Sequence, residues 1–136
     1  MFTVGTDILE IARIKRHIDE KDRFFERYYG DDERAELKSR NYSAQTATGM
    51  FCAKEAFSKA LSIGLVGFSL REVQLLHDEN GAPYLKLSGN AEKQAVQRNM
   101  RFSVSISHTD SIATATVIGY TADYATDDVL PFSRKR

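Results

Sequence analysis

The longest helical pattern in the chain reads AQTATGMFCAKEAFSKALS, residues 44–62. Ser43 is suited to cap its first turn, because a serine hydroxyl accepts from the free backbone N–H groups there, and Gly64 follows its end. One apolar face is expected to carry Met50, Ala53, Phe57, Ala60 and Leu61. A separate stripe, spanning less than about a quarter of the circumference, carries Thr48, Cys52, Glu55, Lys59 and Ser62. We therefore expect this helix to pack through one face and to present polar groups along another.

Alternation of apolar and polar residues elsewhere predicts a small antiparallel sheet. The strands expected from this pattern are residues 2–6, 73–77, 84–87, 102–108 and 113–120. Asn80 and Gly81, between the second and third of these, mark a hairpin because both residues tolerate a positive φ. Ile11, Ile14 and Ile18 recur at helical spacing and predict a second amphipathic helix with a basic outer face. The predicted fold class is α+β, with one long helix packed on a small antiparallel sheet.

Length, charge and cysteine content exclude several classes of protein. With 136 residues, one domain is expected over residues 1–120, followed by a polar, weakly ordered tail at 121–136. Lys plus Arg and Asp plus Glu number 19 each, so the formal net charge is zero, which argues against a general nucleic-acid binder. No apolar run reaches the ~18 residues of a membrane span and no signal core is present, so a cytoplasmic location is expected. The single cysteine, Cys52, is interpreted as a small buried hydrophobe.

Three places in the sequence could carry chemistry, although each also has an ordinary structural interpretation. Asp7 follows the first predicted strand, where it could equally cap a helix. Glu55 and Lys59 could form only a surface ion pair, and His108 at a strand end could be a structural histidine. Taken together, two carboxylates, an ammonium group and an imidazole suit a polyphosphate. Mg²⁺ prefers carboxylate and phosphate oxygens, and a lysine neutralises phosphate charge.

Three blocks of the sequence resemble the short bacterial 4′-phosphopantetheinyl transferases, the holo-[acyl-carrier-protein] synthase family. The opening VGTDI, residues 4–8, matches the family's G-x-D-I segment. The helix block FCAKEAFSKAL, residues 51–61, matches F-x-x-K-E-A-x-x-K-A and is the most specific of the three. The third block, VSISH at residues 104–108, precedes a strand of small residues. The blocks follow the family's order over most of the chain, about residues 2–118.

This resemblance implies a fold and an activity. Members transfer 4′-phosphopantetheine from coenzyme A to a serine of apo-acyl carrier protein, releasing 3′,5′-ADP, in fatty acid biosynthesis, and they use Mg²⁺. They are typically homotrimers with active sites at the subunit interfaces. We therefore expect the phosphopantetheinyl transferase fold, a trimer, and coenzyme A and acyl carrier protein as partners, with neither nucleic acid nor membrane.

The same resemblance implies a role for each matching residue. Asp7 and Glu55 would hold Mg²⁺ against the coenzyme A diphosphate, and Glu55 is the candidate to remove the serine proton. The expected catalytic set is Glu55, Lys59 and His108. The expected coenzyme A contacts are Asp7, Glu55, Lys59, Ser107 and His108. The basic residues expected to dock acidic carrier protein are Arg13, Arg16 and Arg23.

The sequence also departs from the family pattern. Met50 stands where members usually have an arginine that binds the nucleotide end of coenzyme A, and Lys38, Arg40 and Lys86 are the alternatives for that contact. The segment 62–67 lacks the usual G-T-G form. Two other functions stay open at this point: a non-catalytic module that binds coenzyme A or carrier protein, and another small metal-dependent enzyme that cleaves pyrophosphates.

Overall fold

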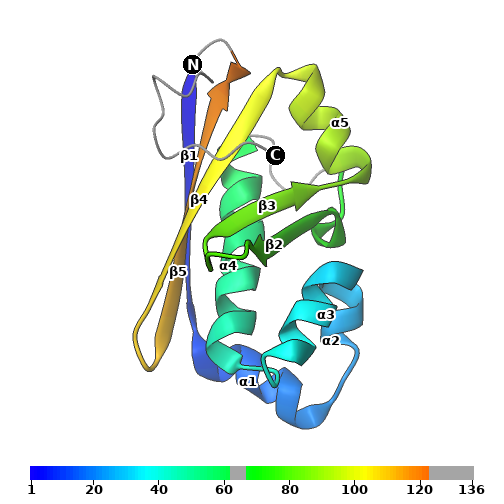
Figure 1. Cartoon of the computed structure of the whole chain (residues 1–136), viewed down its shortest axis with the longest axis vertical. Helices are drawn as coiled ribbons and strands as arrows, with labels where there is room; N and C mark the ends of the chain where they lie inside the picture. Colours follow the sequence, from blue (N-terminus) through cyan, green and yellow to red (C-terminus); the bar gives the residue numbers. More distant parts are fainter. Residues whose placement is uncertain (62–66, 123–136) are drawn as a thin grey trace.

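Two antiparallel sheets and several helices make up the part of the chain that this computed structural model describes, residues 1–61 and 67–122 (Figure 1). The strands are β1 (Phe2–Glu10), β2 (Val73–His77), β3 (Pro83–Leu87), β4 (Met100–His108) and β5 (Ile112–Thr121). The helices are α1 (Ile11–Glu20), α2 (Phe24–Tyr28), α3 (Asp31–Ser39), α4 (Ala44–Leu61) and α5 (Gly89–Gln97), with a 3₁₀ turn η1 (Leu70–Glu72). The α+β class predicted from the sequence is confirmed. Residues 123–136 of the predicted tail lie outside the described part.

The larger sheet has the strand order β1-β5-β4, and both of its pairings are antiparallel. Its register places Asp7 of β1 opposite Ala115 of β5, which in turn lies opposite Ile106 of β4. Two residues further along β4, His108 lies opposite Ala113. Because cross-strand partners share a face and alternate residues of a strand do too, Asp7 and His108 lie on one face of the sheet. That face packs against α4 (Figure 1).

The first strand is longer than the sequence pattern predicts. The pattern indicated a strand over residues 2–6, whereas β1 continues to Glu10 and includes Asp7. The reason is pairing, because every residue of β1 has a partner on β5 and α1 begins only at Ile11. Asp7 is therefore held by strand geometry and does not cap a helix.

A glycine lets β1 cross α4 at close range. A Cβ atom on Gly5 would lie 1.9 Å from the carbonyl oxygen of Ala56 and 2.9 Å from the Cβ of Lys59, so a larger residue cannot be accommodated without moving the strand. Asp7 follows two residues later on the same face of β1. The close crossing thus brings Asp7 beside the polar stripe of α4.

The helix α4 supplies much of the core. The amide of Thr46 donates to the hydroxyl of Ser43 at 3.3 Å, which satisfies one free N–H of the first turn. The expected apolar face is buried along its length, at Met50, Ala53, Phe57, Ala60 and Leu61. These side chains belong to the main hydrophobic core, and α4 itself lies between the larger sheet and the smaller one (Figure 1). Within residues 1–61 and 67–122, no helix is both long enough and apolar enough to cross a membrane.

The strands β2 and β3 form the hairpin that the sequence predicts. Its turn is closed by Asp78, whose Oδ1 accepts from the N–H groups of Asn80 and Ala82 at 2.9 Å each. Gly81 has a φ of 81°, in the left-handed region where glycine is least strained. The tip of this hairpin faces the N-terminal half of α4 and the end of β4.

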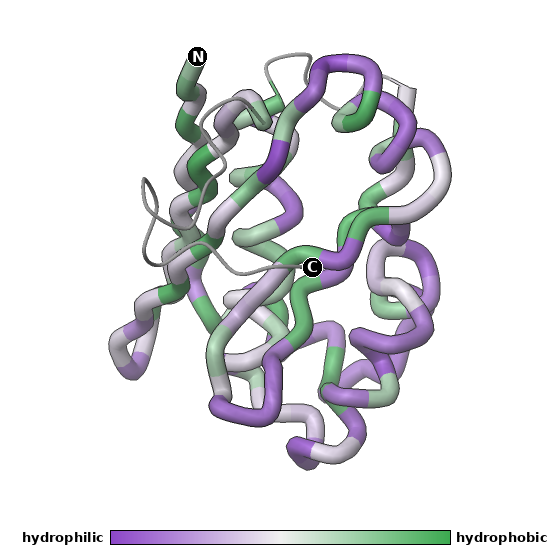
Figure 2. The backbone as a smooth tube through the Cα atoms, turned by 45° about the horizontal axis from the view of Figure 1, so that its top comes forward, coloured by the Kyte–Doolittle hydropathy of each residue, from purple (hydrophilic) through white to green (hydrophobic). Residues whose placement is uncertain are grey.

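The face of the larger sheet that points away from α4 carries a row of exposed apolar side chains. These residues are Phe2, Val4 and Ile8 on β1 and Ile118 on β5. Figure 2 shows green, hydrophobic positions along β1, the strand that begins beside the N-terminus. We call these four residues the apolar sheet face. Phe2, Val4 and Ile118 are neighbours on this face, and Ile8 lies beyond Thr6 on the same strand. Isolated exposed apolar residues are common, but a group of neighbouring ones is typical of an interaction surface.

Candidate active site

Asp7, Glu55 and Lys59 meet where β1 crosses the polar stripe of α4, and we call them the carboxylate–lysine cluster. The Lys59 ammonium donates to the carbonyl oxygen of Thr6 at 2.8 Å, and its Nζ lies 3.5 Å from Oδ1 of Asp7. The side chain of Lys59 remains 55% exposed, whereas that of Asp7 is 21% exposed. The ammonium is thus anchored to β1 and still reaches solvent.

The electrostatics of Glu55 indicate that the two carboxylates interact. The pKa of Glu55 is raised above its ordinary value, first by burial and second by the negative charge of Asp7, while Lys59 opposes the shift. Repulsion of this kind is typical of carboxylates that share a site. Two acidic side chains with one lysine leave a net negative charge that a cation would neutralise.

The thiol of Cys52 contacts this cluster from the buried side. Its Sγ donates to the carbonyl of Ala113 at 3.5 Å. Burial, together with the charge of Asp7 and a hydrogen bond to it, raises the pKa of the thiol to about 12. Metals bind the thiolate, so Cys52 is not a suitable ligand at neutral pH. Its buried position agrees with the interpretation of Cys52 as a small hydrophobe.

The donor set of the cluster fits a hard divalent cation that takes its other ligands from substrate. In the described residues, no three His, Cys, Asp or Glu side chains are grouped so as to hold a metal ion by themselves. Mg²⁺ does not need such a group, because it binds through one or two carboxylates, waters and substrate phosphate oxygens. Asp7 and Glu55 supply that number of carboxylates.

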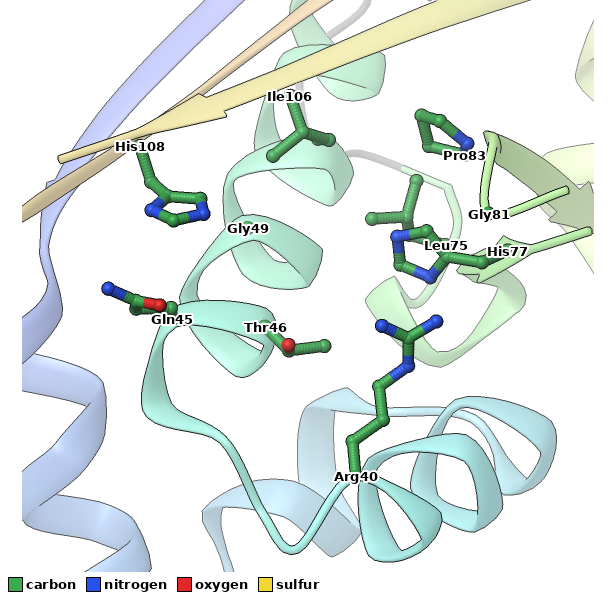
Figure 3. A pocket seen from close by; sticks show the side chains of 10 residues that line it. All are labelled: Arg40, Gln45, Thr46, Gly49, Leu75, His77, Gly81, Pro83, Ile106 and His108. Carbon is green, nitrogen blue, oxygen red and sulfur yellow. The ribbon is translucent and has the colours of Figure 1, made fainter.

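A cavity of about 260 Å³ lies between the N-terminal half of α4, the β2–β3 hairpin and the end of β4 (Figure 3). Its lining residues are Arg40, Gln45, Thr46, Gly49, Leu75, His77, Gly81, Pro83, Ile106 and His108. One guanidinium and two imidazoles are included, and no carboxylate. We call this the basic cavity, because its ionisable groups favour an anionic ligand.

Glu36 organises the basic side chains on one wall of this cavity. Its Oε1 accepts from the backbone N–H of His77 at 2.9 Å, and its Oε2 accepts from Nδ1 of the same histidine at 2.8 Å. Nε of Arg40 lies 3.8 Å from Oε2. A carboxylate only accepts, so Nδ1 of His77 carries the proton and Nε2 is left for a ligand. Figure 3 shows the Arg40 guanidinium and the His77 ring on the same side of the cavity.

The structure separates the predicted site residues into two groups. Asp7, Glu55 and Lys59 come together, whereas His108 lines the basic cavity, whose wall includes none of those three. Ser107 is exposed and, by strand alternation, points to the opposite face of β4 from His108. Within one chain, therefore, the expected coenzyme A contacts do not form a single pocket.

Met50, one of the departures from the family pattern, lies in the core. Met50 is fully buried in the core and does not line the cavity. Of the three basic alternatives, Lys86 donates to Asp32 at 2.7 Å, and only Arg40 lines the cavity. Lys38 is exposed on α3 outside the cavity wall.

The residues expected to dock a carrier protein are all exposed. Arg13 and Arg16 lie on the outer side of α1, whose inner side is buried through Ile11 and Ile14. Arg23 precedes α2, and its Nε donates to Glu26 at 3.0 Å. The three arginines therefore extend from one helix into the next turn of chain.

Sequence reasoning missed His77 as a cavity residue and Glu36 as the carboxylate that holds its ring. The one indication in the sequence is that His77 and Pro83 flank the Asn80-Gly81 turn, which places both residues near the tip of the predicted hairpin. Nothing in the sequence pairs His77 with Glu36, which lies 41 residues earlier.

The comparisons with known proteins place this geometry in a family. Residues 3–117 match the profile of the 4′-phosphopantetheinyl transferase superfamily. The chain belongs to this superfamily, whose members are transferases. It is similar to curated proteins named holo-[acyl-carrier-protein] synthase. One from Clostridium botulinum (strain Alaska E43 / Type E3) is 42% identical over 116 residues, covering 84% of this chain and 94% of the relative. One from Thermoanaerobacter sp. (strain X514) is 37% identical over 132 residues, covering 92% and 96%.

Solved structures agree with these relatives. The holo-[acyl-carrier-protein] synthase from Neisseria meningitidis superposes with a TM-score of 0.80 at 28% identity, covering 88% of this chain and 98% of that one. The Helicobacter pylori enzyme in complex with coenzyme A gives a TM-score of 0.73 at 30% identity, covering 86% and 99%. At these identities the likeness extends beyond the fold class to the family.

Proposed function

We propose that this chain transfers the 4′-phosphopantetheine arm of coenzyme A to a serine of apo-acyl carrier protein, releasing 3′,5′-ADP, as a cytoplasmic enzyme of fatty acid biosynthesis. The observation that carries this proposal is the carboxylate–lysine cluster. Two blocks of sequence about 50 residues apart, both typical of the family, contribute Asp7 on one side and Glu55 with Lys59 on the other. The relatives named as holo-[acyl-carrier-protein] synthases support the same reaction.

We assign the basic cavity to the nucleotide end of coenzyme A. Solved structures of relatives include coenzyme A complexes, and the side chains that line the cavity include one guanidinium and two imidazoles, with the Glu36 carboxylate beside Arg40 and His77. Arg40 is the residue best placed to bind the 3′-phosphate in place of the arginine that Met50 replaces, because a guanidinium matches phosphate geometry. His108 lines the same cavity, with its Nδ1 3.3 Å from the carbonyl oxygen of Thr109, so a phosphate oxygen would contact Nε2 and would require a proton on it as well.

Asp7 and Glu55 would hold Mg²⁺. When bound, the ion supplies charge neutralisation at the diphosphate and orients the reacting phosphorus. Lys59, tied to the Thr6 carbonyl, presents a fixed positive charge to the leaving phosphate oxygens. Ser107 stays a predicted coenzyme A contact, on the other face of β4.

Glu55 is our candidate to take the proton of the carrier serine. In the metal-free cluster, burial and the charge of Asp7 raise the pKa of Glu55, which favours proton acceptance, whereas a bound Mg²⁺ would oppose that shift, so the proton would pass to Glu55 directly or through a water molecule. Attack of the serine oxygen on the β-phosphorus then forms the new phosphodiester bond and breaks the bond to 3′,5′-ADP. The proton lost by the serine passes to the Glu55 carboxylate or to water.

The active site is proposed to form between subunits of a homotrimer. Two features support this. Asp7, Glu55 and Lys59 do not share a pocket with His108 in one chain, and the apolar sheet face is exposed in the isolated chain. Packing that face against a second copy would remove it from water and would allow the cluster of one subunit to face the cavity of another.

The test is to incubate the purified protein with coenzyme A, Mg²⁺ and an apo-acyl carrier protein, and to measure the mass of the carrier. A gain of one phosphopantetheine arm, absent when the carrier serine is replaced by alanine, supports the transferase. Cleavage of coenzyme A without a change in the carrier indicates the pyrophosphate-cleaving alternative. Binding without either reaction indicates a non-catalytic module.

A further inference from the structure

A fully buried ion pair, Lys54 on α4 and Glu33 on α3, lies apart from both the carboxylate–lysine cluster and the lining of the basic cavity. Both side chains are 0% exposed. The Lys54 ammonium donates to the Glu33 carboxylate and to two backbone carbonyls, those of Leu70 at 3.0 Å and Val73 at 2.7 Å. Its three protons therefore all have acceptors, on α3, η1 and the start of β2.

The Glu33 carboxylate is satisfied just as completely. Besides contacting Lys54, its Oε1 accepts from the backbone N–H of Gly30 at 3.0 Å, and its Oε2 accepts from that of Leu75 at 2.9 Å. The backbone N–H of Glu33 donates in turn to the side-chain oxygen of Gln74 at 2.9 Å. The pair thus joins α4, the start of α3 and β2 through directional bonds at one point.

Such a pair is an inefficient way to stabilise a fold. Burial lowers the pKa of Lys54 and raises the pKa of Glu33, because removing an ion from water disfavours its charged form, and each partner's charge opposes the shift. Apolar residues of similar volume often give equal or greater stability at such a position. Apolar contacts lack direction, however, whereas hydrogen bonds fix neighbouring segments in one arrangement.

The segments that this pair joins carry one wall of the basic cavity. Leu75, whose N–H is held by Glu33, lines that wall, as does His77 two residues later on β2. Glu36, one turn after Glu33 on α3, holds the imidazole of His77, and Arg40 lies one turn further. A shift of α3 or β2 relative to α4 would therefore change the width of the cavity.

We propose that Lys54 and Glu33 are positioning residues that hold the α3–β2 wall of the basic cavity in place against α4 and thereby set the affinity for coenzyme A. Neither side chain lines the cavity, so the effect acts through Leu75, His77 and Arg40. The inference depends on the proposed function, because it assumes that coenzyme A occupies this cavity. Loss of the pair should weaken coenzyme A binding without weakening carrier-protein binding.

Two variants test this without leaving an unpaired charge. Glu33→Leu/Lys54→Met removes both charges together, and Glu33→Asp keeps both but shortens the carboxylate side chain by one methylene. For each, we expect the apparent KM for coenzyme A and the calorimetric Kd for coenzyme A to rise roughly tenfold. The KM for carrier protein should not change. Val117→Ala, a core substitution on β5 outside the cavity wall, is the control, and it should lower Tm while leaving coenzyme A affinity as in the wild type.

Each outcome decides the matter. Wild-type affinity for coenzyme A in a pair variant that folds would overturn the inference, as would failure of both variants to fold, since the pair would then serve stability alone. If the wild type binds coenzyme A but transfers nothing to the carrier, the proposed reaction fails, and the Kd values of the variants still test the pair. A wild type that does not bind coenzyme A would overturn both.

Discussion

Lys59 donates to the carbonyl of Thr6 at 2.8 Å while its Nζ lies 3.5 Å from Oδ1 of Asp7, so one ammonium group contacts both the backbone and a side chain of β1. Glu55 lies one turn earlier on α4, and its pKa is raised in part by the charge of Asp7. The cluster therefore contains one positive and two negative side chains, and its net charge is negative. A divalent cation would make it positive, which is the sign that a diphosphate requires.

Replacing Glu55 with glutamine should remove the activity and keep the fold. The amide has nearly the shape of the carboxylate but neither its charge nor its ability to accept the serine proton. We expect kcat to fall at least about 100-fold, the usual contribution of a general base. The measurement is the rate at which carrier protein gains mass at saturating coenzyme A and Mg²⁺. Normal turnover in Glu55→Gln, with unchanged circular dichroism, would remove Glu55 from the mechanism.

The same substitution should stabilise the metal-free protein at neutral pH. The pKa of Glu55 in the folded protein is raised above the ordinary 4.5 of the unfolded chain. At pH values between the unfolded-state and folded-state pKa, the folded state binds more protons than the unfolded state, so stability falls as pH rises through that window. Glutamine avoids this loss. With EDTA present, we expect the free energy of unfolding of Glu55→Gln to exceed that of the wild type by about 0.5 kcal/mol at pH 7, since solvent partly screens this incompletely buried group. The advantage should disappear below pH 4.5; an equal advantage at both pH values would contradict the assignment.

Arg13 should contribute to carrier binding through its charge. Acyl carrier proteins are acidic, and Arg13 is exposed on the outer side of α1. We expect Arg13→Glu to raise the KM for carrier protein roughly tenfold, with little change in the KM for coenzyme A, and added salt to weaken the same step in the wild type. Lys93→Glu makes the same charge change on α5 and is the matched control. Equal effects of Arg13→Glu on both substrates would count against α1 as the docking surface.

The apolar sheet face should be the trimer interface. Ile8 is 63% exposed in the single chain, so a charge there is harmless to the monomer but unfavourable in a buried contact. We expect Ile8→Asp to lower the molar mass in light scattering from that of a trimer to that of a monomer and to abolish transfer. Val96, which is 72% exposed on α5, provides the control Val96→Asp. A trimer that persists in Ile8→Asp, or one that dissociates in Val96→Asp as well, would place the interface elsewhere.

The sequence predicts those parts of the structure that depend on local pattern. The helix from Ala44 and the hairpin at Gly81 follow from periodicity and turn chemistry, which act over a few residues. The end of β1 does not, because its pairing with β5 extends it to Glu10 against the local signal. Tertiary pairing overrides local propensity at such boundaries.

The site divides in the same way. Asp7, Glu55 and Lys59 could be named from family motifs, and the crossing at Gly5 brings Asp7 to α4. Lys54 could not be recognised as buried, since a lysine within a helix is ordinarily solvated and its partner Glu33 lies 21 residues earlier. Residues that become partners only because the fold brings distant segments together produce no periodic pattern in the sequence.

The reactivity of the Cys52 thiol reports whether β1 packs on α4, and it can be measured without any substrate. Its thiol is buried, and its pKa is raised to about 12 by burial first and by the charge of Asp7 second. At pH 8 the thiolate fraction is then roughly 1,000-fold below that of an unfolded chain, so iodoacetamide should label the native protein very slowly and the guanidinium-denatured protein at the normal rate. Asp7→Asn removes the second cause and should speed native labelling modestly, whereas Asp19→Asn, a matched change on the exposed side of α1, should not. Equal labelling of native and denatured protein would mean that the thiol is accessible and that β1 does not cover α4 at this point.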